Sequence, residues 1–430
     1  MSARMCLLAV ATVLTGGALA APVSGAAGPT LVRDIRPNYS SLPANLVAVG
    51  NTLFFTAHGA GGRELWKSDG TEAGTIRVKN IRAGSASSNP FYLTDVAGTL
   101  FFGATDSNGT GLWTSDGTEP GTDLVGYVSF GPITSFRGKA FFGGVEGELW
   151  MSDGTLAGTV PVKDFGDAPI GEMEVVGNRL YIAAGVDGLW VSDGTTDGTN
   201  LVDTIPYTPD SAGFHTLTSA GGRLYFLRDK GATDEISPNV TDLWTSDGTA
   251  SGTARVKNFG NGDDYVQDLV AAQGRLFFTA AGKLWKSSGT ATTTQAVASG
   301  GGPVVNAGGT VYFLRGDGVW KTNGSTAGTV HVTDATPHEN QRCNPHAPCH
   351  VVYRDYDPVG VLGQMAFPSE TGEGVELWIT DASAGGSHLA RDIWPGPEGS
   401  RPANLMRVGN AIFFTANDSV HGRELWRYAP

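Results

Sequence analysis

The chain has 430 residues, of which 62 are glycine, and its formal net charge is −13 at pH 7. The glycine content is about twice the usual share of roughly 7%, which is typical of a protein built from many tight turns. An acidic chain without basic clusters argues against binding to nucleic acids or to anionic membranes.

The first 20 residues have the pattern of a secretory signal peptide. Arg4 supplies a positive charge, an apolar stretch follows from Met5 to Leu14, and Ala18-Leu19-Ala20 has the small residues of a cleavage site. A membrane anchor is less favoured, since Gly16-Gly17 interrupts the apolar run before it reaches the roughly 18 to 20 residues that a span needs. We therefore expect a secreted protein without membrane insertion.

After this leader, the chain shows a pattern of four short strands. Residues 45–49 and 52–57 are rich in apolar residues and are joined by Gly50-Asn51, a two-residue hairpin signal. A glycine-rich loop leads to a third strand at 64–68, and a turn leads to a fourth at 75–81. We find no apolar pattern of helical period in the mature chain, so the unit is predicted to be one antiparallel sheet.

This unit returns through the whole mature chain. A Leu-Trp or Val-Trp pair recurs nine times, in steps of 35 to 58 residues, a period typical of propellers, solenoids and arrays. The turn after it reads Ser-Asp-Gly-Thr in the first five units and then decays. The nine tryptophans are Trp66, Trp113, Trp150, Trp190, Trp244, Trp285, Trp320, Trp378 and Trp426.

The recurring stretch from Glu64 to Thr75, with its Glu-Leu-Trp and Asp-Gly-Thr elements, resembles the ELWxxDGT repeat family of secreted and surface bacterial proteins. The resemblance covers nearly all of the mature chain. It implies repeated β-structure and an extracellular setting, and it implies no catalytic activity.

The two ends of the chain predict a closed ring. Each sheet carries apolar residues on both faces and therefore needs a neighbour on each side, which radial stacking into a β-propeller provides. Arg33-Asp34-Ile35 matches Arg391-Asp392-Ile393, the fourth strand of the eighth unit, whereas the ninth unit has only three strands. We expect Thr30–Ile35 to complete the sheet begun by Asn404–Tyr428. The prediction is an all-β propeller of nine four-stranded antiparallel blades, with eight as the fallback, in one domain over residues 21–430.

The repeated aspartates have two interpretations. Each carboxylate could contribute to a calcium site, because hard cations prefer oxygen ligands. Each could instead cap its own turn through an Asx hydrogen bond, followed by a glycine with positive φ. We favour the turn, since the motif has one carboxylate where calcium sites gather several. The residues are Asp69, Asp116, Asp153, Asp193 and Asp247.

The repeated tryptophans could stack on sugars from exposed positions, or they could fill the wedges between blades. Their regular pairing with Leu or Val favours the wedge, since aromatic motifs repeated in every blade indicate packing. Trp394 lies outside this frame, and we expect it to be partly exposed.

A departure from the repeat at residues 336–357 supplies the candidate binding site, since loops carry function more often than the frames that hold them. The candidate ligand-binding residues are His338, Arg342, His346, His350, Tyr353 and Arg354. Cys343 and Cys349 lie in the same stretch and are predicted to form a disulfide, as expected in a secreted protein. Zinc bound by these cysteines and nearby histidines is the alternative, but the spacing matches no common zinc motif.

We find no nucleophile elbow, catalytic triad, Walker loop or dinucleotide fingerprint. Glu64, Glu148, Glu376 and Glu424 recur with the repeat, which favours a structural role, because an active site is normally built once. The leading hypothesis is a monomeric, non-catalytic secreted or surface-associated propeller that binds an extracellular polysaccharide or protein, without a cofactor. The alternative is a secreted carbohydrate-active hydrolase or lyase on the same scaffold, which rests on fold analogy alone.

Overall fold

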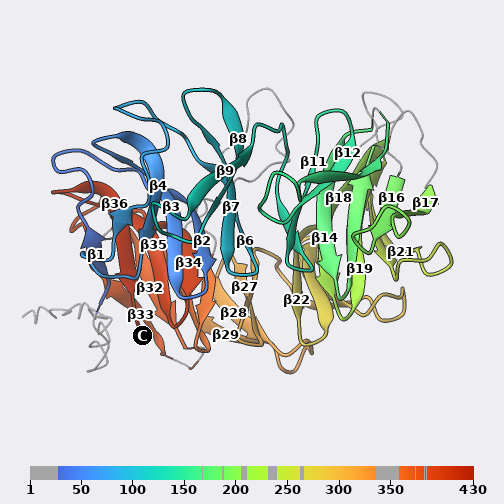
Figure 1. Cartoon of the computed structure of the whole chain (residues 1–430). Helices are drawn as coiled ribbons and strands as arrows, with labels where there is room; N and C mark the ends of the chain where they lie inside the picture. The colour runs from blue at the N-terminus through green and yellow to red at the C-terminus, as the bar shows by residue number, and fades with distance from the viewer. Residues whose placement is uncertain are drawn as a thin grey trace, which may run out of the picture.

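A computed structural model describes residues 28–430 except 167, 186–187, 205–210, 231–239, 262–265, 336–357, 373, 382 and 384. In this part of the chain, 36 strands form nine four-stranded antiparallel sheets, and the sheets are the blades of a ring (Figure 1). Among the described residues there is no helix with the length and apolar character of a membrane span. The all-β propeller with nine blades is confirmed, and the fallback of eight blades is wrong.

The blades follow one another along the chain. Blade 1 consists of β2 Ala44–Val49, β3 Thr52–Gly59, β4 Gly62–Ser68 and β5 Ile76–Arg77, blade 2 of β6 Phe91–Val96, β7 Thr99–Thr105, β8 Thr110–Ser115 and β9 Thr122–Gly126, and blade 3 of β10 Thr134–Phe136, β11 Lys139–Gly143, β12 Glu148–Ser152 and β13 Val160–Asp164. Blade 4 consists of β14 Ile170–Val176, β15 Arg179–Ala184, β16 Gly188–Ser192 and β17 Asn200–Thr204, blade 5 of β18 Ser211–Ala220, β19 Arg223–Lys230, β20 Val240–Ser246 and β21 Ala254–Asn261, and blade 6 of β22 Gln267–Ala272, β23 Arg275–Ala280, β24 Lys283–Ser287 and β25 Gln295–Ser299. Blade 7 consists of β26 Val304–Ala307, β27 Thr310–Arg315, β28 Gly318–Thr322 and β29 Val330–Thr333, blade 8 of β30 Val359–Val361, β31 Gln364–Thr371, β32 Gly374–Thr380 and β33 Ser387–Arg391, and blade 9 of β34 Ala403–Val408, β35 Ala411–Asp418, β36 Gly422–Tyr428 and β1 Thr30–Arg33.

The first strand of the protein closes the ring. β1 pairs antiparallel with β36, with Leu31 opposite Trp426, and it is the fourth strand of blade 9. Figure 1 shows the blue β1 beside the red β36. The predicted closure is therefore confirmed, because the last blade is completed by the strand from the other end of the chain.

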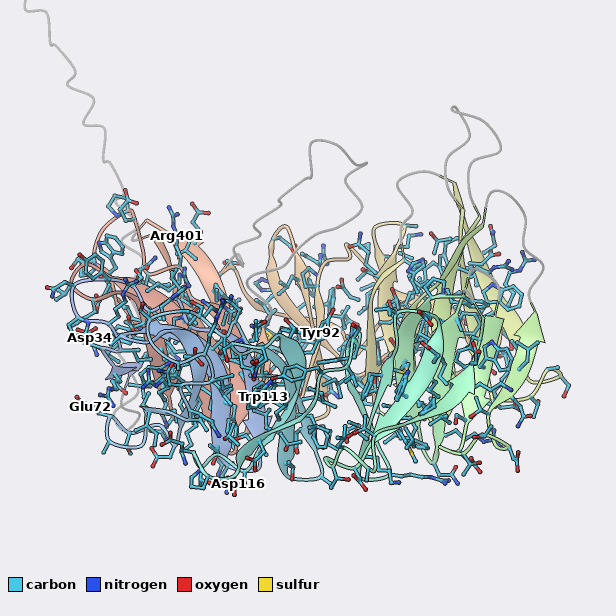
Figure 2. The ribbon with its side chains drawn as sticks, turned by 45° about the horizontal axis from the view of Figure 1, so that its top comes forward. Asp34, Glu72, Tyr92, Trp113, Asp116 and Arg401 are labelled. Carbon is cyan, nitrogen blue, oxygen red and sulfur yellow. The ribbon has the colours of Figure 1, made fainter. Side chains whose placement is uncertain are left out.

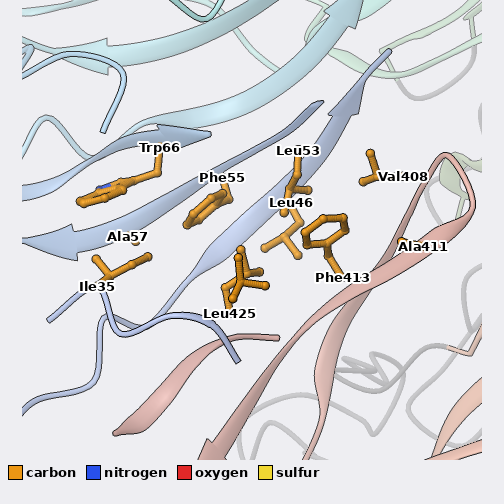
Figure 3. Close-up of a cluster of buried hydrophobic side chains, with 11 residues drawn as sticks. Ile35, Leu46, Leu53, Phe55, Ala57, Trp66, Val408, Ala411, Phe413 and Leu425 are labelled. Carbon is orange, nitrogen blue, oxygen red and sulfur yellow. The ribbon is translucent and has the colours of Figure 1, made fainter. Parts of the chain in front are cut away.

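The side-chain pattern of the second and third strands explains why the blades stack. Phe55 lies opposite Trp66 in the sheet, and both side chains face blade 9, where they pack with Phe413 and Leu425 (Figure 3). The residues next to them in sequence, Phe54 and Leu65, face blade 2 instead. Successive side chains of a strand point to opposite faces, so one short apolar run supplies both faces of the blade.

Each of the nine repeat tryptophans packs in a different inter-blade cluster. This confirms the wedge interpretation. Trp394 is half-buried, as expected.

One predicted element is shorter than expected. The fourth strand of blade 1 was expected at residues 75–81, but β5 covers only Ile76–Arg77. Beyond this strand, Val78 N still donates to Leu65 O at 2.9 Å, whereas Ile81 N donates to the side chain of Glu64.

The alternating strand directions give the ring two different faces. The connections from the first to the second strand and from the third to the fourth lie on one face, which we call the turn face. The connections from the second to the third strand and from the fourth strand to the next blade lie on the other, which we call the loop face. The first strands of neighbouring blades contact each other around the whole ring, including β34 and β2, so they form its inner wall.

Candidate functional site

The repeated aspartates build the turn face. Asp69 Oδ1 accepts hydrogen bonds from Thr71 N at 2.9 Å and from Thr71 Oγ1 at 2.7 Å. Ser68 Oγ accepts from Gly70 N at 2.9 Å. These hydrogen bonds, the one from the Thr71 hydroxyl above all, hold the pKa of Asp69 below its ordinary value. The same pair of bonds to the aspartate recurs at Asp116, Asp153, Asp193 and Asp247.

This geometry agrees with the Asx turn that the sequence favoured. It also explains the second glycine of the motif, because a Cβ atom on Gly74 would collide with the Asp69 carboxylate. The described residues include no group of three or more His, Cys, Asp or Glu arranged to hold a metal ion. The residues proposed for the alternative zinc site lie outside the described part of the chain.

Long basic side chains join neighbouring blades on the turn face. Lys79 Nζ donates to Thr122 O at 2.6 Å, Arg137 Nη1 donates to Asp193 O at 2.8 Å, and Lys286 Nζ donates to Gly324 O at 2.7 Å. Each of these bonds ties one blade to the turn of the next. The turn face is thus held together by its own side chains.

Buried glutamates organise the loop face at blades 8, 9 and 1. Glu64 Oε2 accepts from Ser88 Oγ at 2.6 Å and Glu64 Oε1 accepts from Ser88 N at 3.0 Å, which fixes the loop leading to blade 2. Glu376 binds Ser400 in the same way, and Glu424 binds Ser41. All three glutamates are completely buried. Their role in the described structure is to hold the connections between blades.

Burial makes these carboxyl groups weaker acids. Desolvation raises the pKa of Glu64 and Glu376 although hydrogen bonds from serine and backbone groups act in the opposite direction. For Glu424, burial together with the nearby Asp34 raises the pKa to about 7, again against the bonds from Ser41.

Glu148, the recurring glutamate of blade 3, has a different environment. It is half-buried and lies opposite Asp164 in the sheet. Together with Glu146 it lines a shallow polar hollow on the loop face.

The inner wall of the ring has an unusual backbone. In five first strands one residue near the loop-face end has a positive φ of 53° to 56°, beside an irregularity in the strand register. These residues are Asn45, Tyr92, Thr216, Asp268 and Asn404. We call this set the inner rim. Figure 2 shows Tyr92 toward the centre of the ring, with Asp34 and Glu72 farther out, Arg401 at one edge and Asp116 at the opposite edge.

Tyr92 belongs to an aromatic cluster between blades 2 and 3. The centroid of its ring lies 5.1 Å from that of Phe91 and 6.4 Å from that of Phe130. The Phe91 and Phe130 rings stack with their centroids 5.8 Å apart. Tyr92 is 42% exposed. This cluster was not predicted from the sequence. One feature of the sequence could have indicated it. Gly103 stands where the repeat has a threonine, and the absence of a side chain leaves room for the Phe91 ring.

The predicted ligand-binding residues His338, Arg342, His346, His350, Tyr353 and Arg354 lie outside the described residues, as do Cys343 and Cys349 of the predicted disulfide. The strands that flank this segment are β29, which ends at Thr333, and β30, which begins at Val359. They are the fourth strand of one blade and the first of the next. The two flanking ends therefore lie on the loop face.

No protein-family model and no curated protein matches the chain. Among solved structures, the computationally designed Ika8 protein is similar over 93% of this chain and 99% of its own, at 12% identity and a TM-score of 0.49. BamB from Moraxella catarrhalis is similar over 79% of this chain and 96% of its own, at 12% identity and a TM-score of 0.38. The tricorn protease is similar over 88% of this chain and 38% of its own, at 14% identity and a TM-score of 0.30. These likenesses are too distant to inform the function.

Proposed function

We propose that this chain is a secreted or surface-associated, non-catalytic binding propeller that holds an extracellular polysaccharide or protein on its loop face. In this proposal residues 1–20 are a signal peptide, the mature protein is a monomer, and the chain is a member of the ELWxxDGT repeat family. No cofactor is needed.

The observation that carries the proposal is the difference between the two faces. On the turn face, the connection between the first and second strands has two residues in all nine blades. On the loop face, the connection from a fourth strand to the next blade ranges from four residues, 300–303, to 25 residues, 334–358. A uniform face serves the scaffold, whereas a face with connections of many lengths is where binding residues are normally placed. The strand ends that flank the predicted binding segment, Thr333 of β29 and Val359 of β30, lie on this same face.

The test begins with retention of the mature protein on insoluble and soluble extracellular polysaccharides and on immobilised extracellular proteins. Released sugar fragments are assayed in the same tubes. We expect retention without fragments. Released fragments would favour the hydrolase or lyase alternative. Absence of retention on all of the polysaccharides and all of the proteins would contradict the proposed function.

Two insertion variants then identify the face. A small compact domain is inserted between Ser107 and Asn108, in an exposed hairpin of the loop face, or between Ala97 and Gly98, in an exposed turn of the opposite face of the same blade. Exposed loop tips are the sites where such insertions are tolerated best. We expect the first insertion to weaken retention and the second to leave it unchanged, with circular dichroism confirming that both variants are folded. The reverse result would place the binding surface on the turn face.

A further inference from the structure

On the inner rim, blade 2 departs from the pattern that blades 1 and 9 share. The register pairs Ala44 with Thr56 in blade 1 and Ala403 with Thr415 in blade 9. At the same position in blade 2 it pairs Phe91 with Gly103. The loss of the threonine side chain lets the Phe91 ring lie directly on the glycine. Blade 2 therefore has a phenylalanine opposite a glycine where blades 1 and 9 have an alanine opposite a threonine.

The residue that follows this pair has a positive φ in all three blades. In blades 1 and 9 it is asparagine, which tolerates this conformation well. Asn45 Nδ2 donates to Thr56 Oγ1 at 3.4 Å, and Asn404 Nδ2 donates to Thr415 Oγ1 at 3.2 Å. In blade 2 the residue is Tyr92, with a φ of 53°. A bulky residue is unfavourable in this region, and Gly103 offers no hydroxyl to bond.

Burial does not compensate for this strain, because Tyr92 is 42% exposed. Backbone strain that persists around an outward-facing side chain is typical of a functional position. The Phe91 and Phe130 rings contact the tyrosine ring at interplanar angles of 72° and 59°, and both are themselves half-buried. The result is an aromatic surface held at a fixed angle on the inner rim.

The neighbours of this surface are polar, and the one basic group bonded beside Asn45, the Arg63 guanidinium, donates to Thr56 Oγ1 at 2.7 Å and to Leu42 O at 3.1 Å. Asn45 is exposed, and its amide Nδ2 lies 3.4 Å from Pro90 O, two residues before Tyr92. The other members of the inner rim are Thr216, Asp268 and Asn404. An aromatic face next to amide and hydroxyl groups matches a sugar ring, whose C–H face is apolar and whose edge carries hydroxyls. The chain has a net charge of −13, which disfavours an acidic polymer as the ligand.

We propose that Tyr92, supported by Phe91 and Phe130 and flanked by Asn45, forms a subsite that binds a neutral sugar ring of an extracellular polysaccharide. This inference rests on the proposed function and narrows it to one ligand class and one position on the loop face.

The experiment measures binding of the mature protein by calorimetry to cellohexaose, xylohexaose, maltohexaose and mannohexaose, with an alginate hexamer as the acidic comparison. The decisive variant is Tyr92→Asn, which introduces the residue that blades 1 and 9 have at this position. We expect it to bind the preferred neutral oligosaccharide about tenfold more weakly, the loss expected for about 1.4 kcal/mol of stacking, and to melt no lower than the wild type.

Two controls separate this site from other exposed tyrosines. Tyr39 is 65% exposed and lies in the loop-face connection from β1 to β2. Tyr39→Ala is expected to bind like the wild type, and Tyr92→Phe is expected to keep most of the affinity because stacking needs the ring and not the hydroxyl.

The subsite would be overturned if Tyr92→Asn bound the oligosaccharide as tightly as the wild type. It would also be overturned if the wild type bound only the alginate hexamer, or bound none of the oligosaccharides. If the protein is still retained on other polymers or proteins in those cases, the subsite alone fails. If it is retained on none, the proposed function fails as well.

Discussion

Ser41 and Glu424 are 383 positions apart in the sequence, and the Ser41 hydroxyl donates to Glu424 Oε2 at 2.5 Å. Ser41 N also donates to Oε1, at 2.7 Å. The backbone N–H of Ile35 adds a longer bond of 3.4 Å to the same carboxylate. Because β1 is the strand that completes blade 9, this carboxylate holds the segment that joins the two ends of the ring.

Replacement of Glu424 by alanine is expected to destabilise ring closure. It leaves the buried donors of Ser41 and Ile35 without an acceptor, and the expected loss is about 2 to 4 kcal/mol in the free energy of unfolding. Urea denaturation measures the loss, and hydrogen exchange should show β1 as the first strand to open. The matched control is Glu148→Ala, since Glu148 has the same place in the repeat but is only half-buried. Equal losses in the two variants would contradict the assigned role of Glu424.

The stability of the protein is expected to decrease as pH rises from about 4.5 toward 7. Burial raises the pKa of Glu424 from 4.5 to about 7, and burial also raises the pKa of Glu64 and Glu376. A raised pKa means that the folded state binds more protons than the unfolded state in this interval. The stabilisation that the protonated Glu424 carboxyl group gives to the folded state is therefore complete below pH 4.5 and is lost above pH 7. His421 acts in the same direction, because its hydrogen bond to Asp418 raises its pKa.

The measurement is the melting temperature from pH 4.5 to 8 for the wild type and for Glu424→Gln. The variant should show a shallower decrease, because one titrating carboxyl group is absent while His421 remains. Identical slopes would show that Glu424 does not titrate in this interval. The turn aspartates do not affect this comparison, because their lowered pKa values change the stability only below about pH 4.

The architecture could be predicted because short sequence patterns recur in every blade. Trp66 and its counterparts mark the blades, and the match of Asp34 with Asp392 marks the missing fourth strand of blade 9. The positive φ of Tyr92 could not be predicted, because the register irregularity that produces it depends on pairing with β7. The partner of Glu64 could not be predicted either, because Ser88 is 24 residues away in a loop. The repeat thus specifies the ring, and departures from the repeat must be placed in space before their roles can be recognised.

Loss of a repeat tryptophan is expected to destabilise the protein strongly. Trp66 is 8% exposed and packs with Phe55, Phe413 and Leu425 between blades 9 and 1. Trp66→Ala leaves a cavity in this wedge, and the expected cost is about 3 to 5 kcal/mol. Trp394→Ala serves as the control, because Trp394 is half-buried in a loop and should cost about 1 kcal/mol or less. Comparable losses in chemical denaturation would show that the wedge does not depend on the repeat tryptophan.

The turn aspartates are expected to act through one hydrogen-bonding oxygen and not through calcium. Blade 7 provides a natural comparison, because Asn323 Oδ1 accepts from Ser325 N at 3.0 Å and from Ser325 Oγ at 2.7 Å without a carboxylate. Asp116→Asn should therefore leave the melting temperature nearly unchanged, whereas Asp116→Ala should cost about 1 kcal/mol, as the loss of a cap does. Differential scanning calorimetry with calcium and with a chelator completes the test. A melting temperature that rises with calcium in the wild type and not in Asp116→Asn would show that the carboxylate binds a cation, since a ligand that binds only the folded state must stabilise it.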